Sequence, residues 1–188
     1  MSQRRNRQRL IHSLIYFSEN TVNTGKLKLF KLLYALDFAH FKEIGRSVTG
    51  LDYSAWEKGP VPTDLYKEWQ TPKLDFNRAL SKHTVKFDNG MQKETLRPKV
   101  NFDPLFFSDY QLSLLKQLSK TYFRYYSDAM TKDSHAEFGC WDYVYNVLGM
   151  PSGQIDYDLI LKRQDSERDK AVREIAAEYS AVLENHEI

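Results

Sequence analysis

The sequence predicts a mainly α-helical fold with a small β-hairpin (an α+β fold), arranged as a single compact helical domain with a long C-terminal helix. Apolar residues repeat with the helical period at residues 27–41 and again at residues 172–183. An Asn-Gly pair at residues 89–90 is typical of a tight hairpin turn. The 188 residues suit one domain, which we place at residues 1–164, followed by the C-terminal helix at residues 165–188.

The first half of the chain is predicted to hold two helices and an ordered loop. Apolar residues at helical spacing indicate a first helix at residues 3–19 and a second helix, apolar over a wide arc, that ends at Gly45. The second is therefore expected to be the central helix of the fold. Residues 46–62 combine glycines and prolines with bulky apolar residues, which indicates a packed loop. Pro62 then suits the first turn of a short helix.

The second half is predicted to hold the hairpin and further helices. The return strand of the hairpin contains Pro98, which places it at an edge. Ser108 begins a capping-box sequence, so a helix is expected at residues 108–123. Two more helices are expected at residues 136–148 and 165–185. The apolar stripe of the last one could pack on its own domain or on another chain.

Composition excludes several classes of protein. Charged residues make up 28% of the chain, which excludes a membrane protein, and 41% hydrophobic residues exclude a disordered chain. One cysteine excludes a disulfide framework and, with no recognisable signal peptide, leads us to expect a cytoplasmic protein. The net charge is +2, and an arginine cluster near the start leaves the rest of the chain close to neutral. That cluster consists of Arg4, Arg5, Arg7 and Arg9.

Motifs for catalysis or metal binding are weak. A zinc site needs about four ligands, and His135 with Cys140 has no second pair beside it, so no metal or other cofactor is expected. Cys140 lies in an apolar stretch, which favours a buried, unreactive thiol over a nucleophile. Asp37 lies on the apolar second helix, where a structural hydrogen bond to the nearby loop is favoured. We therefore predict no enzymatic activity, with a hydrolase that uses His135 as the weaker alternative.

Four blocks of the sequence match a known family in their order and spacing. They are KLLYALDFAHF at residues 31–41, GRSVTGLDY at residues 45–53, GPVP at residues 59–62, and the pair Leu65-Tyr66. Together they resemble the Panacea domain, the SocA-like antitoxin domain of bacteria and their phages. A weaker match extends to about residue 161. The resemblance implies structural motif roles for Lys31, Leu33, Tyr34, Asp37, Gly45, Gly50, Pro62, Tyr66, His135 and Trp141.

This resemblance implies a role in binding. Family members neutralise small protein toxins encoded beside them, usually by direct binding. One relative is described as an adaptor that delivers its toxin to an ATP-dependent protease, which makes such a protease a further candidate partner. The expected partner is therefore a cognate protein toxin encoded by an adjacent gene, and no contact with a membrane is expected.

Candidate contact residues for such a partner come from two segments. The loop at residues 46–62 is either a preformed contact surface or a structural lock that holds Trp56 against the second helix, and the lock is slightly preferred. The aromatic cluster at residues 122–126 cannot face inward on every side of a helix, and exposed Tyr and Trp are frequent interface anchors. The candidates are Asp52, Tyr53, Trp56, Gly59, Pro60, Tyr122, Tyr125 and Tyr126.

The alternative function is a nucleic-acid-binding transcriptional regulator of a phage or toxin–antitoxin operon. The arginine cluster could make weak DNA contacts, and the lysines of the hairpin could form a wing beside the helices. A solvated helix start is the plainer interpretation of the arginines, and the near-neutral body argues against a dedicated nucleic-acid binder. A steep salt dependence of DNA retention would distinguish the two functions.

Overall fold

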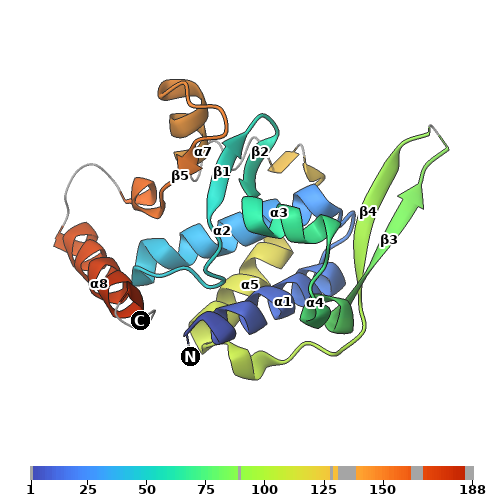
Figure 1. The fold of residues 1–188 in the computed structure, drawn as a ribbon, viewed down its shortest axis with the longest axis horizontal. Coiled ribbons are helices and arrows are strands. Elements are labelled where there is room, and N and C mark those ends of the chain that lie inside the picture. The colour runs from blue at the N-terminus through green and yellow to red at the C-terminus, as the bar shows by residue number, and fades with distance from the viewer. Residues whose placement is uncertain (1, 89, 128, 131–138, 162–166, 185–188) are drawn as a thin grey trace.

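The helix α2 (Lys26–Ile44) lies at the centre of the fold, as the sequence predicts (Figure 1). The computed structural model describes residues 2–88, 90–127, 129–130, 139–161 and 167–184. Helices α1 (Ser2–Asn20) and α5 (Asp109–Thr121) pack against α2 and against each other. Every side chain of α2 from Lys28 to Phe38 is buried. The predicted class, mainly α-helical with a small β part, is confirmed.

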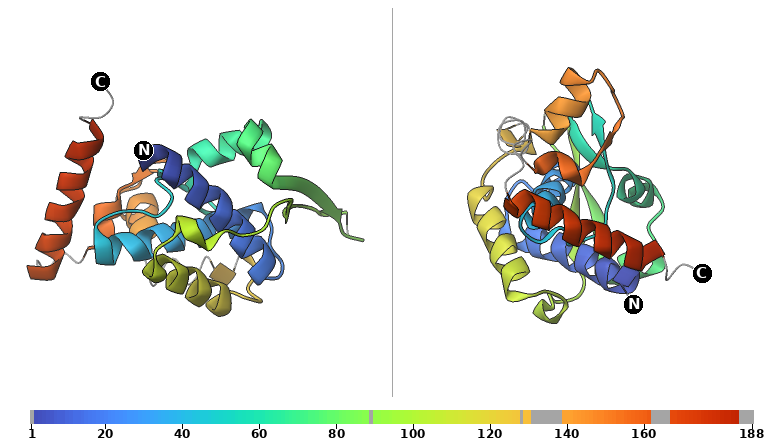
Figure 2. Two further views of the ribbon diagram at one scale, coloured as in Figure 1. Left: turned by 90° about the horizontal axis from the view of Figure 1, so that it is seen from below. Right: turned by 90° about the vertical axis from the view of Figure 1, so that its left-hand side faces the viewer.

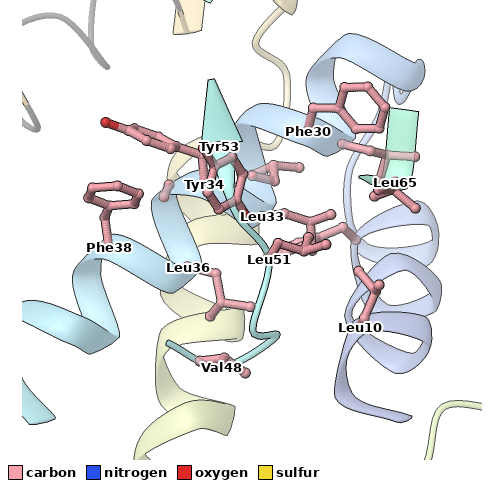
Figure 3. Close-up of a cluster of buried hydrophobic side chains, with 14 of the residues drawn as sticks. Leu10, Phe30, Leu33, Tyr34, Leu36, Phe38, Val48, Leu51, Tyr53 and Leu65 are labelled. Carbon is pink, nitrogen blue, oxygen red and sulfur yellow. The ribbon is translucent and has the colours of Figure 1, made fainter. Parts of the chain in front are cut away.

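The buried core joins α2 to the elements on either side of it (Figure 3). Leu10 comes from α1, Leu33 and Phe38 come from α2, and Leu65 comes from α3 (Thr63–Gln70). Tyr53 enters the same core from the first strand and is 1% exposed. Each of these apolar side chains adds roughly 1.5–3 kcal/mol of burial free energy, so the core fixes the position of the segment that follows α2.

The predicted loop at residues 46–62 is ordered and packed, but half of it forms strands. β1 (Tyr53–Trp56) pairs antiparallel with β2 (Gly59–Pro62) and with β5 (Gln154–Ile155), in the order β2-β1-β5. The loop prediction is wrong here because each strand has only four residues, and the two prolines of β2 are more typical of a loop. β2 lies against α2, so the hairpin is attached to the core.

The predicted hairpin is present. β3 (Leu80–Lys86) pairs antiparallel with β4 (Gln92–Pro98), and Pro98 is the last residue of its strand. The hairpin projects from the helical body (Figure 1). A short helix, α4 (Leu74–Ala79), precedes it and was not predicted, because six residues without a side-chain cap leave little local signal.

The region after the hairpin differs from the prediction in two places. Ser108 caps α5 through a complete capping box, as predicted, but the helix ends at Thr121. The aromatic cluster at residues 122–126 therefore follows the helix. The predicted helix at residues 136–148 begins outside the described residues. Its described part consists of α7 (Cys140–Asp142) and the π-helical turn η2 (Tyr143–Val147).

The C-terminal helix α8 (Glu167–Glu184) lies at the opposite end of the molecule from the β3–β4 hairpin (Figures 1 and 2). It packs against the end of α2. Val172 is buried in this contact, whereas Ile175 and Val182 are 44% and 54% exposed. Within the described ranges, no helix has both the length and the apolar character that crossing a bilayer would need.

Candidate partner-binding site

The buried carboxylate of Asp37 holds the segment after α2 in place. The main-chain N–H groups of Val48 and Thr49 donate to its Oδ1 at 2.8 Å each. The hydroxyls of Tyr53, at 2.8 Å, and Thr49 donate to its Oδ2. Burial raises the pKa of Asp37 to about 6, although these four donors favour the carboxylate. The predicted structural hydrogen bond to the loop is confirmed.

Tyr157 adds a second attachment for the same segment. Its hydroxyl donates to the main-chain oxygen of Leu51 at 2.5 Å, and its ring stacks on Phe38, with ring centroids 4.5 Å apart. Tyr157 belongs to η3 (Tyr157–Ile160), more than a hundred residues after Leu51. The segment that leads into β1 is therefore held from both sides, by α2 and by η3.

Gly59 and Lys31 bring two of the motif blocks into contact. Gly59 has φ +116°, and a Cβ atom there would lie 3.0 Å from Cε of Lys31. A side chain at residue 59 would therefore be strained in its backbone and crowded by the lysine. The ammonium of Lys31 donates to the main-chain oxygen of Ser127 at 2.6 Å. The β1–β2 hairpin and the segment after α5 therefore meet at Lys31.

Lys28, one helical turn before Lys31, attaches the same segment. Its ammonium donates to the main-chain oxygens of Val22 at 2.7 Å and Phe123 at 3.2 Å. Burial lowers the pKa of Lys28 to about 8. These two lysines hold residues 123–127 against α2 by main-chain carbonyls, so the position of the aromatic cluster is set by α2.

A second aromatic group surrounds the β1–β2 hairpin. The ring of Trp56 contacts Tyr66 in α3, with centroids 4.8 Å apart, and its main-chain oxygen accepts from Nε1 of Trp141 at 2.9 Å. Trp141 in turn stacks on Tyr145, with centroids 4.8 Å apart. Trp56 is half-buried, and the aromatic ring that it contacts belongs to α3, whereas the lock hypothesis places Trp56 against the second helix.

The predicted contact residues separate into buried and exposed ones. Tyr53, Gly59, Pro60 and Tyr122 are buried, so their side chains pack within the chain and offer no surface to a partner. Their assignment as contact residues is corrected, since each lies beside a core helix. Asp52, Tyr125 and Tyr126 are exposed, and the last two are 40% and 64% exposed. His135 lies outside the described residues.

Three exposed apolar residues beside β1 were not predicted. Val147, Leu148 and Met150 are 66%, 48% and 52% exposed. The chain just after them pairs with β1, because the N–H of Ser152 donates to the oxygen of Ala55 at 2.7 Å. Gly149 and Pro151 mark a helix end in the sequence, but nothing local shows that these three apolar residues face outward. We call Trp56, Tyr125, Tyr126, Val147, Leu148 and Met150 the hairpin-flanking surface.

Comparison with known families agrees with this geometry. The family model described as "Antitoxin SocA-like, Panacea domain" matches residues 29–142, which include most of α2, the β1–β2 hairpin and Trp141. The chain belongs to this family. No curated protein and no solved structure matches the chain. This SocA-like antitoxin therefore has, in general terms, a toxin as its partner.

The arginine cluster of this antitoxin is used partly within the fold. Arg7 forms ion pairs with Glu68 and with Asp75, the latter at 2.8 Å. The hydrogen bond from Arg7 lowers the pKa of Asp75 to about 2. Nε of Arg9 donates to the main-chain oxygen of Phe106 at 2.9 Å. The interpretation of the cluster as a solvated helix start therefore does not hold for these two arginines. Arg7, which is paired with two carboxylates, is not available for phosphate contacts.

Groups that could carry chemistry are also built into the packing of the Panacea domain. Cys140 is buried, as predicted from the sequence, and burial raises the pKa of its thiol to about 12. In the part of the chain that the structure describes, no three possible metal ligands lie together. The hairpin lysines Lys82 and Lys99 donate to main-chain oxygens of Trp69 and Asn77.

Proposed function

We propose that this SocA-like antitoxin neutralises a protein toxin, encoded by an adjacent gene, by direct binding through the hairpin-flanking surface. The observation that carries the proposal is the exposure of large apolar side chains on both sides of the β1–β2 hairpin, with Tyr126 at 64% and Val147 at 66%. Exposed apolar groups of this kind, gathered beside one element, are typical of protein interaction sites.

The buried motif explains how this surface would bind without a large loss of entropy. Asp37, Lys28 and Lys31 hold the main chain on both sides of the surface through hydrogen bonds to backbone groups. A surface that is already ordered loses little conformational freedom when a partner binds. Aromatic side chains such as Trp56 and Tyr126 can then act as anchors, because they bury a large area with few rotatable bonds.

We propose further that the protein acts by stoichiometric binding, without catalysis. Two groups that might have served as nucleophile or base are instead used in packing. Asp37 accepts four hydrogen bonds within the core, and Cys140 is buried. The proposed antitoxin role therefore needs only binding through exposed side chains and no catalytic group.

The test is co-expression of the antitoxin with the product of the adjacent gene, scored by growth and by co-purification. The wild type should restore growth and form a stable complex. Val147→Asp and Tyr126→Ala should each weaken the complex by at least about tenfold, since interface anchors contribute roughly 2 kcal/mol or more. Val85→Asp and Phe87→Ala, at exposed apolar positions on the distant β3–β4 hairpin, are the matched controls.

The outcomes separate the possible mechanisms. If the hairpin controls lose binding and the surface variants keep it, the toxin binds elsewhere on the chain. If growth is restored without a stable complex, and the toxin level falls in a way that requires an ATP-dependent protease, the protein delivers its toxin for degradation. If the adjacent gene product does not arrest growth and does not co-purify, the proposed partner is wrong.

A further inference from the structure

A cavity of about 320 Å³ lies between the helical body and α8. Its walls come from α1, from the end of α2 and the turn that follows, from the start of α5, and from α8. The residues that matter here are Arg9, His40, Arg46, Ser108, Tyr110 and Tyr179. This volume is in the range of small-molecule sites, and it is separate from the hairpin-flanking surface.

The charged groups that line this cavity are of one sign. Its nine lining residues include the guanidinium groups of Arg9 and Arg46 and no carboxylate. Among the described residues, neither arginine forms an ion pair. Burial, the charge of Arg5 and the charge of Arg46 all lower the pKa of Arg9, while Tyr179 opposes them. The two cations therefore face the cavity without a compensating acid, and a bound anion would stabilise both of them.

His40 holds Arg46 in this position while remaining neutral. Its Nδ1 donates to the main-chain oxygen of Arg46 at 2.5 Å, and its Nε2 accepts from Nε2 of Gln111 at 3.2 Å. Burial and the nearby arginines lower the pKa of His40, which agrees with this neutral tautomer. The turn that carries Arg46 is thereby attached to the start of α5 by groups that are themselves buried.

The remaining groups in the wall suit a phosphate ester. Ser108 accepts the N–H of Gln111 at 3.3 Å, which leaves its O–H proton to donate. The guanidinium of Arg46 lies over the ring of Tyr179, with Cζ 5.2 Å from the ring centroid, so the tyrosine helps to orient the arginine at the cavity. Two guanidinium forks match the oxygens of a phosphate group, and tyrosine rings suit a planar organic group attached to it.

We infer that this cavity binds a small molecule that carries a phosphate group, held by Arg9 and Arg46. The inference is independent of the proposed toxin contact, because none of these residues belongs to the hairpin-flanking surface. It also gives α8 a role, since Tyr179 closes one side of the cavity.

The experiment is isothermal titration calorimetry of the full-length chain with adenosine monophosphate and, separately, with inorganic phosphate. Ionic strength is held constant with sodium chloride. We expect saturable binding of one molecule per chain, with the nucleotide binding more tightly if the tyrosine rings contact its base. Arg46→Gln should weaken binding by at least tenfold. Arg97→Gln, which removes another exposed positive charge, on β4, is the matched control and should leave binding unchanged.

Two results would overturn the inference. One is the absence of saturable binding of either compound to the wild type. The other is equal loss of binding in Arg46→Gln and Arg97→Gln, which would show a general effect of net charge. Because the side chain of Arg46 is exposed, the variant should keep the thermal midpoint of the wild type. That midpoint is measured in the same samples. If it falls, Tyr179→Phe and Tyr179→Ala replace the arginine variant, and Tyr179→Ala should bind the nucleotide at least tenfold more weakly than Tyr179→Phe.

Discussion

The central helix α2 and the C-terminal helix α8 carry similar apolar stripes, but the structure buries one and leaves much of the other exposed. In α2, every side chain from Lys28 to Phe38 is buried, because α1, α5 and β2 all pack against it. In α8, Val172 is buried at the contact with α2, and Val182 is 54% exposed. An apolar stripe thus predicts a helix and its inner face, whereas the number of neighbouring elements decides how much that face stabilises the fold.

The contact between the two helices is made close to Gly45, the residue that ends α2. A Cβ atom at Gly45 would lie 2.7 Å from the main-chain oxygen of Val172. Gly45 also has φ +71°, so its lack of a side chain serves both the end of α2 and the approach of α8. Four predictions test how strongly the two helices differ.

The largest effect is expected in the core of α2. Leu33 is fully buried, so Leu33→Ala should lower the free energy of unfolding by about 2–5 kcal/mol, through lost burial and a cavity. Val182→Ala in α8 should change it by less than about 0.5 kcal/mol. Urea denaturation of both variants measures the difference. Equal losses would show that α8 packs as tightly as α2.

The buried Asp37 should make stability depend on pH. Burial raises its pKa from 3.8 to about 6, so the folded protein binds this proton more tightly than the unfolded chain does. The stabilisation is complete below the unfolded pKa and is lost as the pH rises through about 6, by up to roughly 3 kcal/mol.

The pH test compares the free energy of unfolding of the wild type and Asp37→Asn between about pH 4 and pH 7, the range set by linkage. The wild type should lose stability relative to Asp37→Asn as the pH rises across this range. Glu43→Gln, at the α8 contact, should keep the wild-type profile. Parallel profiles for the wild type and Asp37→Asn would mean that the carboxyl titrates at its ordinary pKa.

A smaller effect is expected at the junction of the two helices. Gly45→Ala should lower the free energy of unfolding by about 1–2 kcal/mol, because alanine is strained in the left-handed backbone conformation. Contact of the new methyl group with the main-chain oxygen of Val172 should add to this loss. Gly90→Ala is the matched control, since its φ is +79° and nothing lies within 4 Å of the added Cβ. Thermal or urea denaturation should therefore show a larger loss for Gly45→Ala. A loss of stability no greater than that of Gly90→Ala would mean that α8 does not approach Gly45 as closely as the structure shows.

The smallest effect is expected for the ion pair between Arg168 of α8 and Glu43 of α2. Both side chains are substantially exposed, at 66% and 36%, so Glu43→Gln should change the free energy of unfolding by no more than about 0.5 kcal/mol. Any effect should disappear at about 1 M salt, where such pairs are screened. A loss above 1 kcal/mol that persists in salt would show that this pair, and not Val172, holds α8.

Features with a local cause could be predicted from the sequence. The capping box at Ser108 uses groups three residues apart, and Gly45 ends α2 by its own backbone conformation. The strands β1 and β2 could not be predicted in the same way, because each has four residues and two prolines interrupt β2. β1 also pairs with β5, about a hundred residues later in the chain, which no local pattern indicates.

The candidate site could be predicted in part. Trp56, Tyr125 and Tyr126 were identified because aromatic residues are frequent at interfaces, and they do lie at or near the surface. Tyr53 and Tyr122 have the same side chain but are buried. The hydroxyl of Tyr53 donates to the buried Asp37, and Tyr122 directly follows the last residue of α5. The exposure of Val147 and Leu148 had no sequence signal, because it follows from where β5 pairs with β1.

By itself, the sequence determined the helical periods, the helix ends and the motif blocks of the family, because these depend on neighbours within a few residues. Tertiary packing decided which aromatic residues are exposed and where the hairpin-flanking surface lies. It also placed Arg9 and Arg46, which are far apart in the sequence, on one cavity. The physical reason is that burial and charge compensation depend on contacts between distant segments, such as those of α2 with α5 and α8.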